Sequence, residues 1–260
     1  MFSERGLSES LAAVRAEHAP GALVLDCERD FESLPPAQAE ELGLLVDSLD
    51  PVSYPSEWVP AHAPDILSEY AGDEFIVGMP GDGGVAWTTQ TEPPVVLVKP
   101  RLEGSPSSFV EFLLATALVE AGLGEPEHFL GFFGDRYPDF QAAGGGLDPV
   151  DVYQIGAACY DAYLGRQTRD IFAGWEQPYP DLFAAWIDAG ERLEPRLSGL
   201  VSDVARGQTD FADAAELACS AVRHGGELPD PFAALDTDAY SDHGADYAVE
   251  WLSRTVDALD

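Results

Sequence analysis

Three charged residues lie at the ends of two apolar stretches, and their types are those of metal-dependent hydrolases. Asp26 and Glu28 lie at the end of the stretch 22–27, and Lys99, the single lysine of the chain, follows the stretch 95–98. Two carboxylates can hold Mg²⁺ while an amine positions the attacking water. If the two stretches form adjacent strands, the three side chains resemble a nuclease site. Such nucleases, however, have an acid two residues before the lysine, a position that is leucine here.

Each of these residues also has a simpler interpretation. Asp26 and Glu28 fit a solvated face, and Lys99 fits a residue retained by chance. A functional Lys99 could instead pair with a phosphate or carboxylate, or act as a base if burial lowers its pKa. The sequence leaves these alternatives open, and it does not decide whether the protein is an enzyme.

Glu127 and His128 form a second candidate pair, between two strongly apolar segments. His128 could act as a general base with Glu127 as its orienting partner. Neighbours on a helix point apart, however, which favours a structural histidine at a helix junction. The other histidines lack HxxxH, HxH or HExxH spacing, so the sequence predicts no histidine-built metal site and no cofactor.

The C-terminal half contains arginines that could together form an anion-binding pocket. These residues are Arg136, Arg166, Arg169, Arg192, Arg196 and Arg223. Surface pairing with nearby carboxylates, such as Arg166 with Asp170 one turn later, is the simpler interpretation.

The charge of the chain is extreme. The sequence has 47 acidic and 13 basic residues, a net charge of -34, and no asparagine. Such charge repels itself in dilute buffer, but at about 1 M salt the Debye length falls to roughly 3 Å and the repulsion largely disappears. The composition therefore predicts a soluble protein of a salt-rich cytoplasm. It disfavours direct nucleic-acid binding by a basic face, although an acidic mimic of nucleic acid stays open.

The cysteines and the apolar segments support the same setting. Cys27, Cys159 and Cys219 are odd in number and far apart, as expected for buried free thiols in a reducing cytosol. No apolar run approaches the roughly 18 residues that a membrane span needs, so we expect no membrane partner.

Hydrophobic periodicity predicts an N-terminal part with a small, mostly antiparallel sheet and flanking helices. We expect a helix from Pro36 to about Leu49 with Leu45 inward, and strands over 75–79 and 85–90 joined by the turn 80–84 as a hairpin. A further strand over 95–98 and a core helix from Ser107, with Phe109 on its inner face, complete this part.

The C-terminal part is predicted to be helical. The run Gly144–Gly146 is the best boundary, which gives a sheet-containing part over 1–143 and a helical part over 147–260, with a core that may be continuous. In the last helix, Tyr247, Trp251, Thr255 and Leu259 fall on one face and predict a packed stripe. The fold class is therefore α+β.

Three segments together resemble a known family. They are APGALVLDCERDFESLPPAQAEEL, FIVGMPGDGGVAWTTQTEPPVVLVKPR and PEHFLGFFGDRYPD. The chain is similar from end to end to a family of uncharacterised proteins of extremely salt-loving archaea, a domain of unknown function. The resemblance implies a cytoplasmic, high-salt setting and brings no activity, substrate or site residue.

The sequence thus favours a non-catalytic protein that acts by binding or assembly, with a protein partner or a second copy of the chain as possible partners. The alternative is a Mg²⁺-dependent hydrolase or nuclease-like enzyme that uses Asp26, Glu28 and Lys99. An acidic nucleic-acid mimic is the second alternative.

Overall fold

The computed structural model describes residues 2–79 and 81–259, which form two compact units. The sheet unit comprises Met1–Ser53, Gly72–Glu127 and Tyr179–Ala185. The helical unit comprises Tyr54–Ala71, His128–Pro178 and Trp186–Asp260. The chain therefore passes between the units several times.

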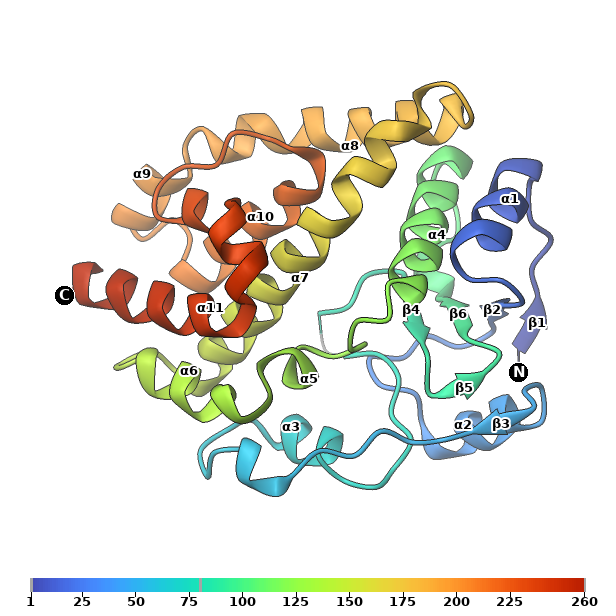
Figure 1. The fold of residues 1–260 in the computed structure, drawn as a ribbon, viewed down its shortest axis with the longest axis horizontal. Coiled ribbons are helices and arrows are strands. Elements are labelled where there is room, and N and C mark those ends of the chain that lie inside the picture. The colour runs from blue at the N-terminus through green and yellow to red at the C-terminus, as the bar shows by residue number, and fades with distance from the viewer. Residues whose placement is uncertain (1, 80, 260) are drawn as a thin grey trace. The chain divides into compact units, whose positions relative to one another are not determined.

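The described strands all belong to the sheet unit, and helices of very different lengths occur in both units (Figure 1). The strands are β1 (Phe2–Glu4), β2 (Leu23–Cys27), β3 (Ser48–Leu49), β4 (Val85–Thr88), β5 (Thr91–Glu92) and β6 (Val95–Val98). The α-helices are α1 (Glu9–His18), α2 (Pro36–Gly43), α3 (Asp65–Tyr70), α4 (Ser107–Gly122), α5 (Phe129–Phe133), α6 (Tyr137–Ala143), α7 (Pro149–Ala173), α8 (Pro180–Leu197), α9 (Leu200–Ala205), α10 (Phe211–Ala221) and α11 (Asp238–Leu259). The 3₁₀-helices are η1 (Ser56–Trp58), η2 (Pro100–Leu102), η3 (Gly134–Arg136), η4 (Gly174–Glu176), η5 (Val222–His224) and η6 (Phe232–Leu235).

A small mixed sheet forms the centre of the sheet unit. Its strand order is β1-β2-β6-β4, in which β2 and β6 run parallel and the two outer pairings are antiparallel. All four residues of β6 are buried, as expected for a central strand covered on both faces. β3 and β5 form a separate antiparallel pair. The predicted α+β class with a small, mostly antiparallel sheet and a largely helical C-terminal half is confirmed.

Helix α4 covers one face of this sheet. It packs against β4 and β6, and α1 packs against it in turn (Figure 1). At Gly122 a Cβ atom would lie 2.0 Å from the carbonyl oxygen of His18, so only glycine permits this approach. The prediction that Phe109 lies on the inner face is wrong. Its side chain is 41% exposed because burial of α4 begins only at Val110.

The predicted hairpin over 75–79 and 85–90 is also wrong. Residues 75–79 form no strand, and β4 pairs with β6 instead, with Val85 opposite Val98. The backbone oxygens of Ile76 and Val77 accept hydrogen bonds from the Gln90 side chain and from the Leu34 N–H. Ile76 and Val77 are buried and Phe75 and Met79 are partly buried, but the backbone bonds of this segment go to a side chain and to a loop. Pro80, in the expected turn, lies outside the described residues.

The helix predicted from Pro36 to Leu49 ends early. α2 stops at Gly43, and Leu49 belongs to β3, opposite Thr91 of β5. Leu45, predicted to be inward, is 47% exposed because it follows the end of the helix and no longer shares its buried face with Leu42.

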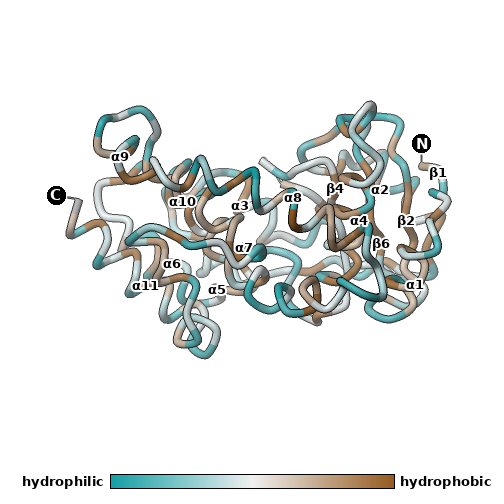
Figure 2. The backbone as a smooth tube through the Cα atoms, turned by 90° about the horizontal axis from the view of Figure 1, so that it is seen from above, coloured by the Kyte–Doolittle hydropathy of each residue, from teal (hydrophilic) through white to brown (hydrophobic). Residues whose placement is uncertain are grey.

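The helical unit is organised around α7. Helix α10 packs against α7, and α11 packs against α6 and α7. The rings of Phe129, Phe133, Tyr137, Phe140 and Tyr153 form an aromatic core between α5, α6 and α7. Polar and apolar stretches alternate along α11 in Figure 2, as expected for a helix with one buried face.

Helix α11 is sharply kinked at Gly244. This residue has φ +48° and ψ -119°, outside the helical region. A Cβ atom at this position would also lie 3.3 Å from the ring of Phe132. The positive φ therefore lets α11 change direction beside Phe132 of α5.

We expect Gly244→Ala to lower the free energy of unfolding by about 1–2 kcal/mol, because alanine is strained at positive φ and has a close ring contact there. The matched control is Gly174→Ala, at a glycine with φ -70° and no atom within 4 Å of an added Cβ. Urea unfolding in molar KCl measures both. Equal effects of the two substitutions would contradict this account of the kink.

Candidate functional site

The pairing of β2 with β6 places Asp26 and Lys99 on adjacent strands but not together. Asp26 lies opposite Val98, and side chains alternate between the faces of a strand, so Asp26 and Lys99 face opposite sides. The Asp26 carboxylate accepts a hydrogen bond from Arg5 at 2.5 Å, on the side of α1. Glu28 follows β2 and is exposed. The structure thus does not gather the three residues into one site.

Lys99 is almost completely buried. Its side chain is 1% exposed, and its Nζ lies 4.7 Å from the centre of the Phe31 ring. Within the described residues, Nζ has no hydrogen-bond partner. Burial lowers the pKa of Lys99, and the nearby charge of Arg101 lowers it further, whereas the Asp82 carboxylate opposes the shift. Lys99 is therefore an isolated amine inside the sheet unit.

Arg101 ties together the loops around this amine. Its guanidinium donates to Asp30 at 2.9 Å, to Glu32 at 2.9 Å and to the backbone oxygen of Asp82 at 3.2 Å. Burial raises the pKa of the Asp82 carboxyl group, while the charge of Lys99 lowers it. Lys99 is thus surrounded by charged side chains that connect loops. Arg101 is bound to Asp30 and Glu32, and Asp82 accepts a hydrogen bond from the Met79 N–H.

A cavity of about 480 Å³ lies at the ends of β2 and β6, beside the start of α4, and both Asp26 and Lys99 contribute to its lining although Glu28 does not. Its lining includes the bonded pair Arg5 and Asp26, together with Glu103 and Glu111. In the part of the chain that the structure describes, no three His, Cys, Asp or Glu side chains are placed to hold a metal ion. Three carboxylates, Asp26, Glu103 and Glu111, and two cations, Arg5 and Lys99, thus contribute to the lining, and Asp26 is already bonded to Arg5.

We expect Lys99→Met to change the free energy of unfolding by less than about 1 kcal/mol, or to increase it. Methionine keeps the apolar stem and removes a buried charge that lacks a hydrogen bond. Lys99→Ala, which also removes the stem, should cost about 2 kcal/mol. Urea unfolding in molar KCl checks both. A loss above about 2 kcal/mol in the methionine variant would show that the charge itself holds the loops.

Glu127 is a buried structural acceptor. Its carboxylate accepts hydrogen bonds from the Thr88 hydroxyl and the Thr89 N–H, both at 2.8 Å, and from the Gln90 amide. Burial raises the pKa of Glu127, and these hydrogen bonds oppose the shift. Glu127 thereby fixes the turn between β4 and β5.

His128 is buried separately, in the helical unit. Its Nδ1 accepts a hydrogen bond of 3.0 Å from the Leu130 N–H and caps α5, and its ring stacks on Tyr70 at 4.0 Å. Burial lowers the pKa of His128 to about 3, so the ring is neutral. Its Nε2 has no hydrogen-bond partner among the described residues, so Glu127 does not orient it.

The burial of His128 predicts a pH dependence. The unfolded histidine titrates near 6.5 and the folded one near 3, so the unfolded state binds more protons between these values. The stabilisation is complete above pH 6.5 and is lost as the pH falls toward 3. We expect the contribution of His128 to the free energy of unfolding to fall by about 1.4 kcal/mol per pH unit in this window.

The matched variant for this effect is His128→Asn, which keeps an acceptor for the Leu130 N–H but does not titrate. Urea unfolding at pH 7 and pH 5 should show a smaller pH effect in the variant than in the wild type. The opposing contribution of Glu127 is common to both chains and cancels in this difference. The same pH effect in both chains would contradict a neutral, buried His128.

The arginines of the helical unit do not converge on an anion pocket. Arg136 binds Asp139 and Asp246, Arg192 binds Asp188, and Arg223 binds Asp161. Arg196 lines a cavity of about 450 Å³ together with the carboxylates of Asp203, Asp213 and Glu216. Each of these arginines thus has carboxylates near it, which leaves little positive charge for an outside anion.

Arg166 and Arg169 share one carboxylate. Both donate to Asp236, at 2.5 Å from Arg166 and 2.9 Å from Arg169, and Arg166 also binds Ser241 and Asp238. The side chains of Asp236 and Arg166 are only 17% and 13% exposed. This arrangement fixes the end of η6 and the start of α11 against α7.

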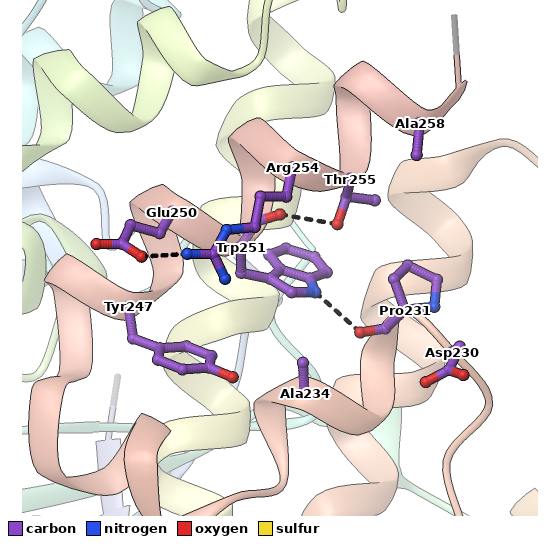
Figure 3. Close-up of a pocket in the computed structure, with 9 residues that line it drawn as sticks. All are labelled: Asp230, Pro231, Ala234, Tyr247, Glu250, Trp251, Arg254, Thr255 and Ala258. Atoms are coloured by element: carbon purple, nitrogen blue, oxygen red, sulfur yellow. Dashed lines mark hydrogen bonds and ion pairs between the residues drawn. The ribbon is translucent and has the colours of Figure 1, made fainter.

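The segment fixed in this way forms one wall of a cavity of about 500 Å³ in the helical unit. The lining residues come from α11 and from the segment around η6, and Figure 3 shows them: Asp230, Pro231, Ala234, Tyr247, Glu250, Trp251, Arg254, Thr255 and Ala258. The α11 residues recur every three or four positions, so they share one face of the helix. Most of the lining is apolar, and polar groups converge at its edges.

One hydrogen bond joins the two walls of the cavity, and one ion pair lies at its edge. The Trp251 indole N–H donates to the backbone oxygen of Pro231 at 2.9 Å and joins α11 to the opposite wall. At the edge, Arg254 donates to Glu250 at 2.7 Å. The Trp251 ring also lies against the rings of Phe211 and Phe232, with centroids 6.2 and 6.3 Å away. The cavity therefore has a fixed aromatic wall.

Sequence periodicity found this face of α11 but not the cavity. The predicted packed stripe consists of Tyr247, Trp251, Thr255 and Leu259. Trp251 and Thr255 are buried, Tyr247 is partly buried, and the side chain of Leu259 lies outside the described part of the chain. The opposite wall comes from Asp230 to Ala234, a short stretch without helical periodicity. Nothing in the spacing of such residues distinguishes a face that packs fully from one that leaves a space.

A family of unknown function (DUF7089) matches residues 1–259. No curated protein and no solved structure matches the chain. No helix in the described part of the chain combines the length and the apolar character needed to cross a lipid bilayer.

Proposed function

Since the chain belongs to this family of unknown function, we propose from its own geometry that it is a non-catalytic protein that binds a small molecule between α11 and η6. The observation that carries this proposal is the cavity around Trp251. Its volume of about 500 Å³ lies within the range of roughly 300–1,000 Å³ that is typical of ligand sites. Its apolar walls with a few polar groups at the edges are also typical of such sites.

A catalytic role has less support from the geometry. Asp26 and Lys99 face opposite sides of the sheet, and Glu127 and His128 have separate structural partners. The Mg²⁺-dependent alternative would need Asp26, Glu28 and Lys99 to act on one substrate, which the register of β2 and β6 disfavours. Binding without reaction needs only the cavity around Trp251 and no alignment of catalytic side chains.

The proposed setting is a salt-rich cytoplasm. The net charge of -34 supports it, because dense electrolyte screens repulsion among carboxylates. Cys27, Cys159 and Cys219 support it as well, since all three are free and buried, as is common in a reducing compartment. Binding experiments on this protein therefore belong in molar KCl.

The test of the proposal is to fill the cavity. We expect Ala258→Phe and Ala234→Leu to weaken binding at least ten-fold, because each places a larger side chain in the space between the walls. The probes are benzyl alcohol, benzylamine and benzoate, titrated into ¹⁵N-labelled chain in 1 M KCl. The readout is the indole N–H signal of Trp251, assigned from its absence in Trp251→Phe.

The matched control is Ala142→Phe, at an exposed position of α6 outside the cavity lining, and it should bind as the wild type does. Binding of at least one probe, lost in the filled variants and kept in this control, is the expected result. If no probe shifts the Trp251 signal at millimolar concentration, or if the filled variants bind equally well, the proposal is wrong.

A further inference from the structure

We infer that the preferred ligand of this cavity is a small organic cation, an ammonium group carried on an aromatic or alkyl body. This inference rests on the proposed function and names the class of molecule that the cavity would take. It follows from two features of the lining, the distribution of its charged groups and the nature of its walls.

Carboxylates outnumber cations in the lining. Asp230 and Glu250 contribute two negative charges, and Arg254 contributes one positive charge. Arg254 is bound to Glu250 at 2.7 Å, one helical turn away, so these two charges largely offset each other. Asp230 belongs to no ion pair among the described residues. The charge left to attract a ligand is therefore negative.

The aromatic walls favour the same kind of ligand. The Tyr247 and Trp251 side chains both belong to the lining, and aromatic rings attract cations through their electron-rich faces. Figure 3 shows the Trp251 ring between the Glu250–Arg254 pair on one side and Asp230 on the other, with the Tyr247 ring below the pair. A ligand with an apolar body against the rings can place its ammonium group near the Asp230 carboxylate.

Arg254 is the group that could favour the opposite choice. If its bond to Glu250 opened, the guanidinium could bind an anionic ligand such as a carboxylate. Its side chain is 77% exposed and Asp230 is exposed as well, so solvent and salt weaken the attraction of both groups for a charged ligand. The rings of Tyr247 and Trp251 in the lining add an attraction for a cation that an anion lacks. The geometry therefore points to the cation.

The three probes named above test this inference, since they share a phenyl ring and differ mainly in charge. In 1 M KCl we expect benzylamine to bind about five-fold more tightly than benzyl alcohol, and benzoate to bind most weakly. Asp230→Asn should reduce the ratio of the benzyl alcohol and benzylamine dissociation constants to about two. Asp257→Asn, at an exposed α11 position outside the lining, should leave this ratio unchanged.

The outcomes separate this inference from the function on which it rests. If benzyl alcohol or benzoate binds as tightly as benzylamine and the filled variants block them, the cavity is a binding site and the preference for cations is wrong. If Asp230→Asn and Asp257→Asn alter the ratio equally, the effect is general electrostatics and the inference also fails. If none of the probes binds, both proposals fail together.

Discussion

The ion pairs of Asp236 with Arg166 and Arg169 are the interaction on which the cavity of the helical unit depends. The Asp236 carboxylate is bound by these two arginines of α7 and lies between η6, which forms one wall, and α11, which forms the other. Because Asp236 and Arg166 are mostly shielded from water, salt screens this attraction less than it screens surface pairs. Charge-assisted bonds of this kind fix both distance and direction. The walls thus have a defined separation before any ligand arrives.

Arginine–carboxylate pairs of this kind use up much of the positive charge of the chain. Basic residues are few, and many of the arginines join segments that are distant in sequence, as Arg101 does with Asp30 and Arg223 does with Asp161. A guanidinium that holds two segments together is not available to an outside anion. This use of the few cations leaves the surface carboxylates largely unpaired, in agreement with an environment in which salt screens them.

Sequence periodicity predicted those helices and strands whose position depends only on the burial of apolar side chains. The strands β2 and β6, the core helix α4 and the stripe of α11 all followed from the spacing of apolar residues. Periodicity failed where burial and backbone pairing diverge. Residues 75–79 are apolar and largely buried, but their backbone bonds go to a loop and to a side chain, so composition suggested a strand that does not exist.

The candidate sites were harder to predict, for a related reason. The adjacency of β2 and β6 was a condition of the nuclease hypothesis and is present, but the register that separates Asp26 from Lys99 depends on long-range pairing. The cavity near Trp251 lies between α11, which is kinked at Gly244, and a non-periodic stretch around Pro231. Neither has a signal in local spacing, because glycine and proline are common in loops of every kind.

The burial of Lys99 has a consequence for how the protein can be labelled. Lys99 carries the one ε-amine of the chain, and it is 1% exposed. The folded protein therefore offers acyl donors and isopeptide-forming enzymes no accessible lysine. An acyl group found on this side chain would report a molecule whose sheet unit had opened, which makes Lys99 a built-in probe of that opening without any introduced tag.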